Sequence, residues 1–156
     1  MGLHVVNKEE AGEETKGLTL IDAINGFNEI SRLTMLWTVR HRWPSGVRFT
    51  LNCYRHEVQL VVRRPAAICH ILTSREGVTQ GDPLSMVLYG LGLLPLAEVI
   101  READPGVIQP WYANNVSMWG TIRRNTKLLR ALMEKGPFNG YSPETEKSWN
   151  ICAGGR

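Results

Sequence analysis

The stretch from Val107 to Trp119 constrains the fold of this sequence more than any other feature. It holds two short apolar runs on either side of the pair Asn114-Asn115. Asparagine tolerates the positive φ values that a tight turn between two strands requires. The stretch therefore predicts a β-hairpin whose tip carries two uncharged side-chain amides.

Length and composition indicate one globular domain. The chain has 156 residues, enough to bury a hydrophobic core, and 43% of them are hydrophobic while 21% are charged. No run approaches the roughly 18 apolar residues of a membrane span, and the polar, acidic N-terminus does not resemble a secretory signal. We expect a flexible acidic lead-in over residues 1–16, a folded domain over residues 17–152 and a short tail over residues 153–156.

Cysteine usage favours an intracellular location. Cys53, Cys69 and Cys152 make an odd number without the spacing of a disulfide framework, which indicates a reducing compartment. A zinc site built from Cys53, His56 and the Cys69-His70 pair is disfavoured, because the second pair is adjacent and standard ligand spacing fails. We therefore expect a protein of the cytoplasm or the nucleus, without a membrane partner.

Positive charge is concentrated in residues 32–75, which contain eight arginines and a single acidic residue, Glu57. Such a segment attracts a phosphate backbone, and the guanidinium group fits phosphate oxygens better than an ammonium group does. A solvated surface or pairing within the molecule is the alternative explanation. The arginines that would contact nucleic acid are Arg40, Arg42, Arg48, Arg55, Arg63, Arg64 and Arg75.

The first half of the chain is predicted to contain strands around one helix. Residues 17–22 predict a short buried strand that ends on a carboxylate. A helix is predicted from its N-cap Asn25 to about Arg40. Its predicted core residues are Phe27, Ile30, Leu33, Leu36 and Trp37. We expect one or two strands in residues 47–62 and another extended pair in residues 68–80.

The second half is predicted to hold a helix on each side of the hairpin. Asp82-Pro83 is a helix start signal, and the helix that follows to about Ala103 is apolar on nearly every side, so we expect it to be largely buried. Residues 121–135 predict an amphipathic helix, and residues 149–151 a short strand. The core residues of the amphipathic helix would be Ile122, Leu128, Leu129 and Leu132. This order of elements describes an α+β fold, with an antiparallel sheet and helices packed on one face.

Two motifs in the first two thirds of the chain recur together in one enzyme family. Residues 20–28 place Asp22 at the end of a predicted strand, with the aromatic Phe27 five residues later. Residues 77–85 follow the pattern glycine–x–x–glutamine–glycine–x–x–leucine–serine. The second pattern is the more specific of the two.

Two later motifs complete the set. Residues 112–115 place tyrosine, alanine and two asparagines at the predicted hairpin, and Gly140 precedes Lys147 by seven residues. With all four motifs in order, the region from Leu18 to Ile151 resembles the reverse transcriptase domain of non-LTR retroelements. The resemblance implies a palm-type sheet with partial fingers and no thumb, as in a piece of a larger retroelement protein.

The implied activity is RNA-directed DNA polymerisation, a nucleotidyl transfer that uses two Mg²⁺ ions about 4 Å apart. Its partners would be RNA or an RNA/DNA duplex and a deoxynucleotide. Asp22 would be a metal ligand, Asn114 and Asn115 would occupy the other ligand positions, and Lys147 would approach the triphosphate and donate a proton to the leaving group. The nucleotide pocket would be formed by Ala23, Phe27, Gln80 and Gly81.

Each of these residues also has a simpler explanation. A carboxylate at position 22 can be a cap or a surface group, and Phe27 can be a core residue of its helix. Gln80-Gly81 can be a plain strand-to-helix turn, and Lys147 a solvated turn lysine. Asp82 is fully explained as a helix cap, so we assign it no catalytic role.

The asparagine pair departs from the family, in which both positions are normally aspartate. Two neutral amides lower the charge of the site by two units and remove most of the Coulomb attraction for two dications. A loss of several kcal/mol corresponds to several decades in rate, while the turn itself is unaffected because asparagine suits it as well as aspartate does. We therefore expect the scaffold to persist with weakened Mg²⁺ binding and little or no polymerase activity.

Two other interpretations remain open. The chain could be a non-catalytic nucleic-acid-binding module that uses the arginine-rich segment 32–75, or a partner-binding retroelement relic that exposes the surface a thumb would cover. RNA binding that weakens steeply with salt separates the first from the second. Primer extension separates an active polymerase from both.

Overall fold

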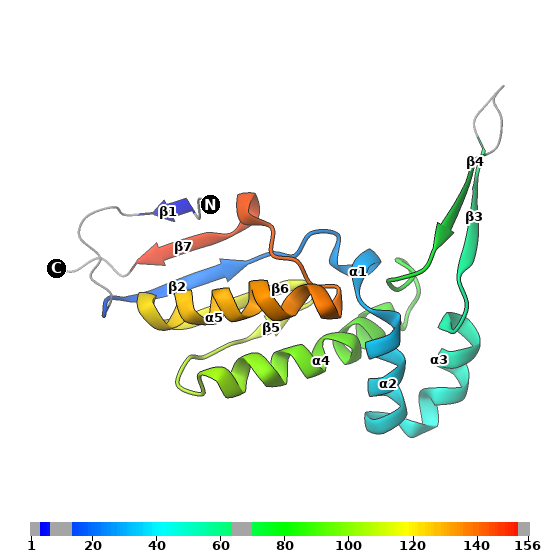
Figure 1. Ribbon diagram of the computed structural model, residues 1–156, viewed down its shortest axis with the longest axis horizontal. Helices are drawn as coiled ribbons and strands as arrows, with labels where there is room; N and C mark the ends of the chain where they lie inside the picture. The colour runs from blue at the N-terminus through cyan, green and yellow to red at the C-terminus, as the bar shows by residue number, and fades with distance from the viewer. Residues whose placement is uncertain (1–3, 7–13, 64–69, 153–156) are drawn as a thin grey trace.

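The protein is described here by a computed structural model, which covers residues 4–6, 14–63 and 70–152. A five-stranded sheet runs in the order β1-β7-β2-β6-β5, and helices α4 and α5 lie along one face of it (Figure 1). The strands of this sheet are β1 (His4–Val6), β2 (Lys16–Ile21), β5 (Trp111–Tyr112), β6 (Asn115–Thr121) and β7 (Trp149–Cys152). The helices are α1 (Gly26–Glu29), α2 (Arg32–Arg42), α3 (Val47–Tyr54), α4 (Ser85–Ala103) and α5 (Ile122–Lys135). Short 3-10 turns are η1 (Pro44–Gly46), η2 (Gly136–Asn139) and η3 (Thr145–Lys147).

The sheet is antiparallel apart from the parallel pair of β1 and β7. In the central pair, the register runs from Lys16 opposite Thr121 to Ile21 opposite Val116. Because side chains alternate along a strand, Thr19 and Ile21 are buried under the helices, whereas Leu20 between them faces the other side of the sheet. The predicted α+β class, with an antiparallel sheet and helices on one face, is confirmed.

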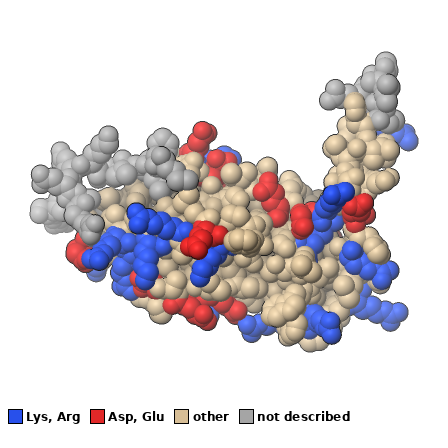
Figure 2. Space-filling model, viewed as in Figure 1, with Lys and Arg blue, Asp and Glu red and all other residues tan. Residues whose placement is uncertain are grey.

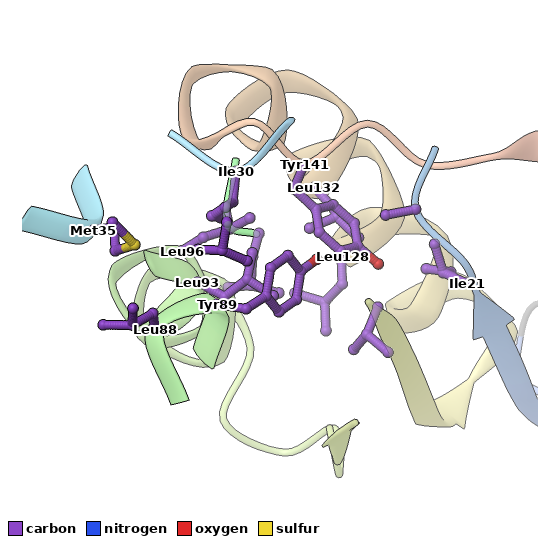
Figure 3. Packing of buried hydrophobic residues seen from close by; sticks show 14 of the residues in the cluster. Ile21, Ile30, Met35, Leu88, Tyr89, Leu93, Leu96, Leu128, Leu132 and Tyr141 are labelled. Carbon is purple, nitrogen blue, oxygen red and sulfur yellow. The ribbon is translucent and has the colours of Figure 1, made fainter. Parts of the chain in front are cut away.

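The core lies between the sheet and the helices α4 and α5. Leu96 of α4 and Leu128 and Leu132 of α5 are fully buried, and so is Leu88 of α4, which lies beside Met35 of α2 (Figure 3). Full burial of a leucine side chain contributes about 1.5–3 kcal/mol relative to leaving it in water.

We call this sheet with α4 and α5 the body. Within the described residues, no helix is long and apolar enough to cross a membrane.

A second, two-stranded sheet projects away from the body (Figure 1). It consists of β3 (Val58–Val62) and β4 (His70–Ser74), which pair antiparallel over five residues each, and we call it the arm. The side chains of both strands are exposed or half-buried.

One buried arginine, Arg32 at the start of α2, fastens the root of the arm to the rest of the protein. The Arg32 side chain donates hydrogen bonds to the carbonyl of Gly77 at 2.8 Å, and to the carbonyl and the hydroxyl of Ser74 at 3.1 and 2.9 Å. Its guanidinium also lies 5.6 Å from the ring centroid of Tyr54. Although Arg32 belongs to the arginine-rich segment, its charge is therefore used inside the protein.

The single helix predicted from Asn25 to about Arg40 is wrong, because two helices cover this region. Ile30 has an extended ψ of 131° that ends α1, and Ser31 then caps α2 by accepting a hydrogen bond from the backbone of Thr34 at 3.3 Å. The restart changes which side chains face inward. Ile30, Met35 and Val39 are buried, whereas Leu33 and Trp37, predicted to be in the core, are 79% and 57% exposed.

The strand prediction for residues 47–62 is half wrong, because Val47–Tyr54 forms the helix α3 and only Val58–Val62 is a strand. Thr50 and Tyr54, one helical turn apart, are both buried, and the Thr50 hydroxyl donates to the carbonyl of Gly46 at 2.9 Å. Strand propensity is a weak preference that tertiary packing overrides.

Other elements lie close to their predicted places. The strand at residues 17–22, the amphipathic helix and the strand near residues 149–151 correspond to β2, α5 and β7. The predicted helix start at Asp82-Pro83 is two residues early, because α4 begins at Ser85 with Leu84 as its N-cap and without a side-chain cap. The Asp82 carboxylate instead accepts a hydrogen bond from the backbone of Leu84 at 2.8 Å, in the turn that precedes the helix. The apolar helix α4 is buried on one side only, since Met86 and Val87 are exposed. The predicted lead-in contains β1, and the predicted tail at residues 153–156 lies outside the described part of the chain.

Candidate functional site

The pairing of β2 with β6 brings Asp22 to the tip of the hairpin. Asp22 follows β2 directly, and the last residue of that strand, Ile21, is opposite Val116. The Asn114 side-chain amide donates a short hydrogen bond to the Asp22 carboxylate and a longer one, 3.5 Å, to the carbonyl of Ala23. Residues that are 92 positions apart in the chain therefore meet at one point.

The hairpin turn is displaced by one residue from its predicted place. Tyr112 and Asn115 are the last register pair, so the turn consists of Ala113 and Asn114. The positive φ, +50°, belongs to Ala113 rather than to an asparagine. Asn114 and Asn115 consequently differ in role, because the first is in the turn and the second begins β6.

The buried side chain of Tyr141 holds this turn in position. The Tyr141 hydroxyl donates to the carbonyl of Asn114 at 3.0 Å, and the Tyr141 ring meets Trp111 edge-on at 5.7 Å. A Cβ on Gly26 would lie 2.9 Å from the Asn114 Cβ and 2.6 Å from the Tyr89 hydroxyl oxygen. The close approach of α1 to the turn therefore requires glycine at position 26.

A small pocket of about 250 Å³ joins three of the predicted site residues. Asp22, Asn115 and Lys147 line it, together with Leu20, Ser117 and Trp149. Leu20, Asn115 and Ser117 alternate along their strands with the buried residues Ile21 and Val116, so the pocket opens on the face of the sheet opposite α4 and α5.

The chain after η2 holds the far side of this pocket. The backbone N–H of Glu144 donates to the carbonyl of Asp22 at 2.7 Å, and that of Lys147 donates to the carbonyl of Glu144 at 3.2 Å. These bonds connect the strand that ends at Asp22 with the segment that carries the predicted lysine.

The four residues predicted to form a nucleotide pocket are not all together. Ala23 is buried beside Asp22 and forms a bridge with Pro143, and Phe27 stacks on Tyr89 with ring centroids 4.4 Å apart. Gln80 instead lines a separate pocket of about 660 Å³ between the arm and the helices α1, α2 and α3. Gly81 is an exposed turn residue with φ +89°.

Sequence reasoning missed two buried tyrosines next to this site, Tyr89 and Tyr141 (Figure 3). Burial raises the pKa of both phenols, and the negative charge of Asp22 raises the pKa of each further. Both rings therefore stay neutral at neutral pH and add no charge beside Asp22. A tyrosine inside the apolar run 84–96 was the available signal for Tyr89.

The donor set around Asp22 is poor in charge. Within the residues that the structure describes, no three His, Cys, Asp or Glu side chains are grouped so that they could hold a metal ion. Asn114 presents its NH₂ group to the carboxylate. Turning that amide over would bring two acceptor oxygens together, so the observed hydrogen bond is the favourable arrangement without a cation.

The arginines of segment 32–75 differ in their surroundings in the folded protein. Arg40, Arg48, Arg55 and Arg63 are exposed. Arg42 and Arg75 are paired with Glu98 and Glu57, each at 2.9 Å. Arg64 lies outside the described residues, as does Cys69 of the disfavoured zinc site. Figure 2 shows Lys and Arg atoms around α2 and α3 and a second group over α5, which sequence reasoning did not single out.

Comparison with known proteins shows a structural likeness without a sequence match. No protein-family model and no curated protein matches the chain. The structure of telomerase from Candida tropicalis with a TWJ fragment of telomeric RNA superposes with a TM-score of 0.69 at 10% identity, over 94% of this chain and 27% of that one. Telomerase from Candida albicans with a TWJ fragment of telomeric RNA gives 0.65 at 10% identity, over 90% and 28%.

Apo telomerase from Candida tropicalis, truncated from its C-terminal domain, gives a TM-score of 0.64 at 11% identity, over 91% of this chain and 31% of that one. This chain therefore spans less than a third of the length of these telomerases. Its fold is similar to part of telomerase, an enzyme related to reverse transcriptases.

Proposed function

We propose that this chain is a reverse-transcriptase-like palm of the non-LTR retroelement type, with RNA-directed DNA polymerase ancestry and an impaired catalytic site. Support comes from the order of the four motifs and from the likeness to part of telomerase. The observation that carries the proposal is the hydrogen bond from the Asn114 amide to the Asp22 carboxylate. The hairpin tip and the strand end meet as a polymerase centre requires, but through an amide where a second carboxylate belongs.

The residues present fit a pair of Mg²⁺ ions poorly. Mg²⁺ prefers charged oxygen ligands, and two ions at one site need several carboxylates. Among the described residues that line the pocket, Asp22 is the one carboxylate, and a cation would have to displace the Asn114 amide to reach its bonded oxygen. Interactions of single charges in a partly desolvated site are worth several kcal/mol, so the loss of two charges lowers the rate by several decades.

A primer-extension assay tests the proposal directly. The purified chain is incubated with a primer annealed to an RNA template, deoxynucleotides and either Mg²⁺ or Mn²⁺. We expect no extension above a blank without protein. Template-dependent extension above that blank would overturn the proposed impairment.

Restoring the charges tests the geometry of the site. The double variant Asn114→Asp/Asn115→Asp should raise the thermal midpoint when Mg²⁺ is added, since bound ligand stabilises the folded state. The matched control Asn28→Asp/Asn52→Asp adds the same two charges at exposed positions away from the pocket and should show no such rise. Equal responses of the two variants would contradict the assignment of Asp22, Asn114 and Asn115 to one site.

RNA or an RNA/DNA duplex and a deoxynucleotide are the proposed ancestral partners, within a longer retroelement protein. The site would once have bound Mg²⁺, with Lys147 near the triphosphate and with Ala23, Phe27, Gln80 and Gly81 near the nucleotide. The shared pocket of Asp22, Asn115 and Lys147 supports this arrangement. The separate position of Gln80 counts against a single preformed nucleotide pocket.

A second candidate function is nucleic-acid binding without catalysis through segment 32–75. The exposure of Arg40, Arg48 and Arg55 on α2 and α3 favours it. The variant Arg40→Gln/Arg48→Gln/Arg55→Gln should then bind a labelled single-stranded RNA more weakly and with a smaller salt dependence. If the unmodified chain binds no RNA at low salt, the partner-binding relic becomes the better explanation.

A further inference from the structure

The outer face of α5 carries a line of positive charge that neither the motifs nor segment 32–75 includes. Arg123, Lys127 and Arg130 follow one another at helical spacing, so they point to the same side of the helix. From the first to the last, the line extends about 10 Å along the helix axis at 1.5 Å per residue. Figure 2 shows Lys and Arg atoms gathered at the left of the molecule, over the first turns of α5.

These cations line an open groove of about 840 Å³ between α5 and the end of α4. Arg124 forms the groove wall and is held by Asp104, with one of its hydrogen bonds at 2.9 Å. The Lys127 ammonium donates to the carbonyl of Ala103 at 3.4 Å. Arg124 is thus paired within the protein, whereas Lys127 is held in position by a carbonyl and keeps its charge for an anion, which lowers the entropy that it loses on binding.

The groove also contains acidic groups, which limit its charge. Asp104 is neutralised by Arg124, and Glu134 lies at the far end of the lining. Glu14 approaches Arg123 at 4.0 Å, and both side chains are largely exposed. Exposed pairs of this kind contribute about 0–1 kcal/mol, so a phosphate can replace the Glu14 carboxylate.

The lining indicates which kind of partner the groove fits. A protein interface usually has an apolar centre with aromatic or aliphatic anchors. Every residue of α5 is described, and none of them is an exposed large apolar side chain. Arginine is the main cation here, and its planar guanidinium matches phosphate oxygens. A phosphate backbone therefore suits the groove better than an acidic protein does.

We propose that the α5 groove binds the phosphate backbone of a single-stranded nucleic acid. It is separate from the candidate site, because α5 covers the face of the sheet opposite the pocket of Asp22 and Lys147. Asn125, on the inner side of the same helix, donates to the carbonyls of Gly17 and Met118 at 3.1 Å each. The helix is thus firmly attached to the sheet, and the proposed contact does not depend on the proposed polymerase ancestry.

The test is fluorescence anisotropy with a labelled oligouridine of about 16 nucleotides, titrated with the full chain at several KCl concentrations. The variant Arg123→Gln/Lys127→Gln/Arg130→Gln should bind about tenfold or more weakly. The slope of log K against log salt should become shallower by about 2, since each phosphate contact on a single strand contributes about 0.7. The matched control Lys16→Gln/Arg101→Gln/Lys135→Gln removes the same number of charges from residues that do not line the groove, and should change binding little.

A gain of charge provides a test that misfolding cannot imitate. Glu134→Lys adds a cation to the same line and should strengthen binding and steepen the salt slope by about 0.7. Equal losses in the two triple variants would overturn the proposal, because net charge alone would then explain binding. So would an unchanged slope in the α5 variant, or binding of polyglutamate in place of oligouridine.

Discussion

The body and the arm are built from similarly apolar strands but bury them to different extents. In β6, Val116 and Met118 are completely buried under the helices, whereas Leu60 and Ile71 of the arm are 50% and 62% exposed. Alternating burial specifies the register of a strand, because a shift by one residue would turn its apolar side chains into water. An isolated two-stranded hairpin lacks this specification and is marginally stable. The body therefore determines the stability of the fold, and the arm depends on its attachment to the body.

The largest expected loss of stability comes from truncating one side chain in the core of the body. Leu128→Ala should lower the free energy of unfolding by about 4 kcal/mol, since it removes a completely buried side chain and leaves a cavity. The matched change in the arm, Leu60→Ala, should cost about 0.5 kcal/mol. Urea unfolding followed by circular dichroism measures both. Comparable losses would show that the arm is packed as firmly as the body.

Alanine substitutions at two glycines with positive φ should give the next largest effect on stability. Gly140 has φ +72°, and a Cβ there would collide with the carbonyl of Glu29, so Gly140→Ala should cost about 3 kcal/mol. Gly81 has φ +89° but open space around it, so Gly81→Ala should cost only about 1 kcal/mol of backbone strain. Thermal unfolding of the two variants distinguishes collision from strain. An equally small loss at position 140 would place η2 further from α1 than described.

The hydrogen bond at the hairpin tip should have a smaller effect. Tyr141→Phe removes the donor to the Asn114 carbonyl in a buried setting and should cost about 1.5 kcal/mol. Tyr112 is 77% exposed on the same hairpin, so Tyr112→Phe should cost less than about 0.5 kcal/mol. Chemical denaturation measures the free energy of unfolding of both variants. Equal losses would mean that the Tyr141 hydroxyl does not stabilise the turn.

The smallest expected effect depends on pH. Hydrogen bonds from the Arg124 side chain hold the pKa of Asp104 below its ordinary value. The carboxylate therefore stabilises the fold above the unfolded pKa of about 3.9, and this contribution is lost as the pH falls through the lower folded pKa. Asp104→Asn should lower the thermal midpoint at pH 7, and the difference from the unmodified chain should disappear in strong acid.

The arm supplies the control for this pH effect. Glu57 and Arg75 form a pair at 2.9 Å, but both side chains are more than half exposed, so Glu57→Gln should leave the midpoint unchanged at every pH. A clear shift for Glu57→Gln would contradict the distinction between the two regions.

Elements with strong local patterns could be predicted from the sequence. The amphipathic pattern of α5 and the apolar run of α4 each indicate one type of element, and the hairpin is bounded by clear turn residues. The resemblance to reverse transcriptases, rather than these patterns, implied that Asp22 and the hairpin tip lie near each other. The fold class and the meeting of Asp22 with Asn114 were therefore accessible in advance.

The remaining features depend on contacts between distant residues. The restart of the helix at Ser31 reverses the exposure of Leu33, and no local signal in the apolar spacing marks it. The positive φ fell on Ala113 because the strand register, rather than turn propensity, determined the two turn residues. Asn125 is a completely buried amide that bonds to two neighbouring strands, a role that composition cannot reveal.

The buried side chain of Arg32 has a mechanical consequence for the arm. Its hydrogen bonds to Gly77 and Ser74 lie in a buried setting, so breaking them would leave a buried charged group without partners. The arm is therefore held at the end of β4 that lies next to α2. Movement of the arm relative to α2 should therefore increase with distance from Ser74, and a spectroscopic label on Val62 would report motion that a label beside Ser74 would not.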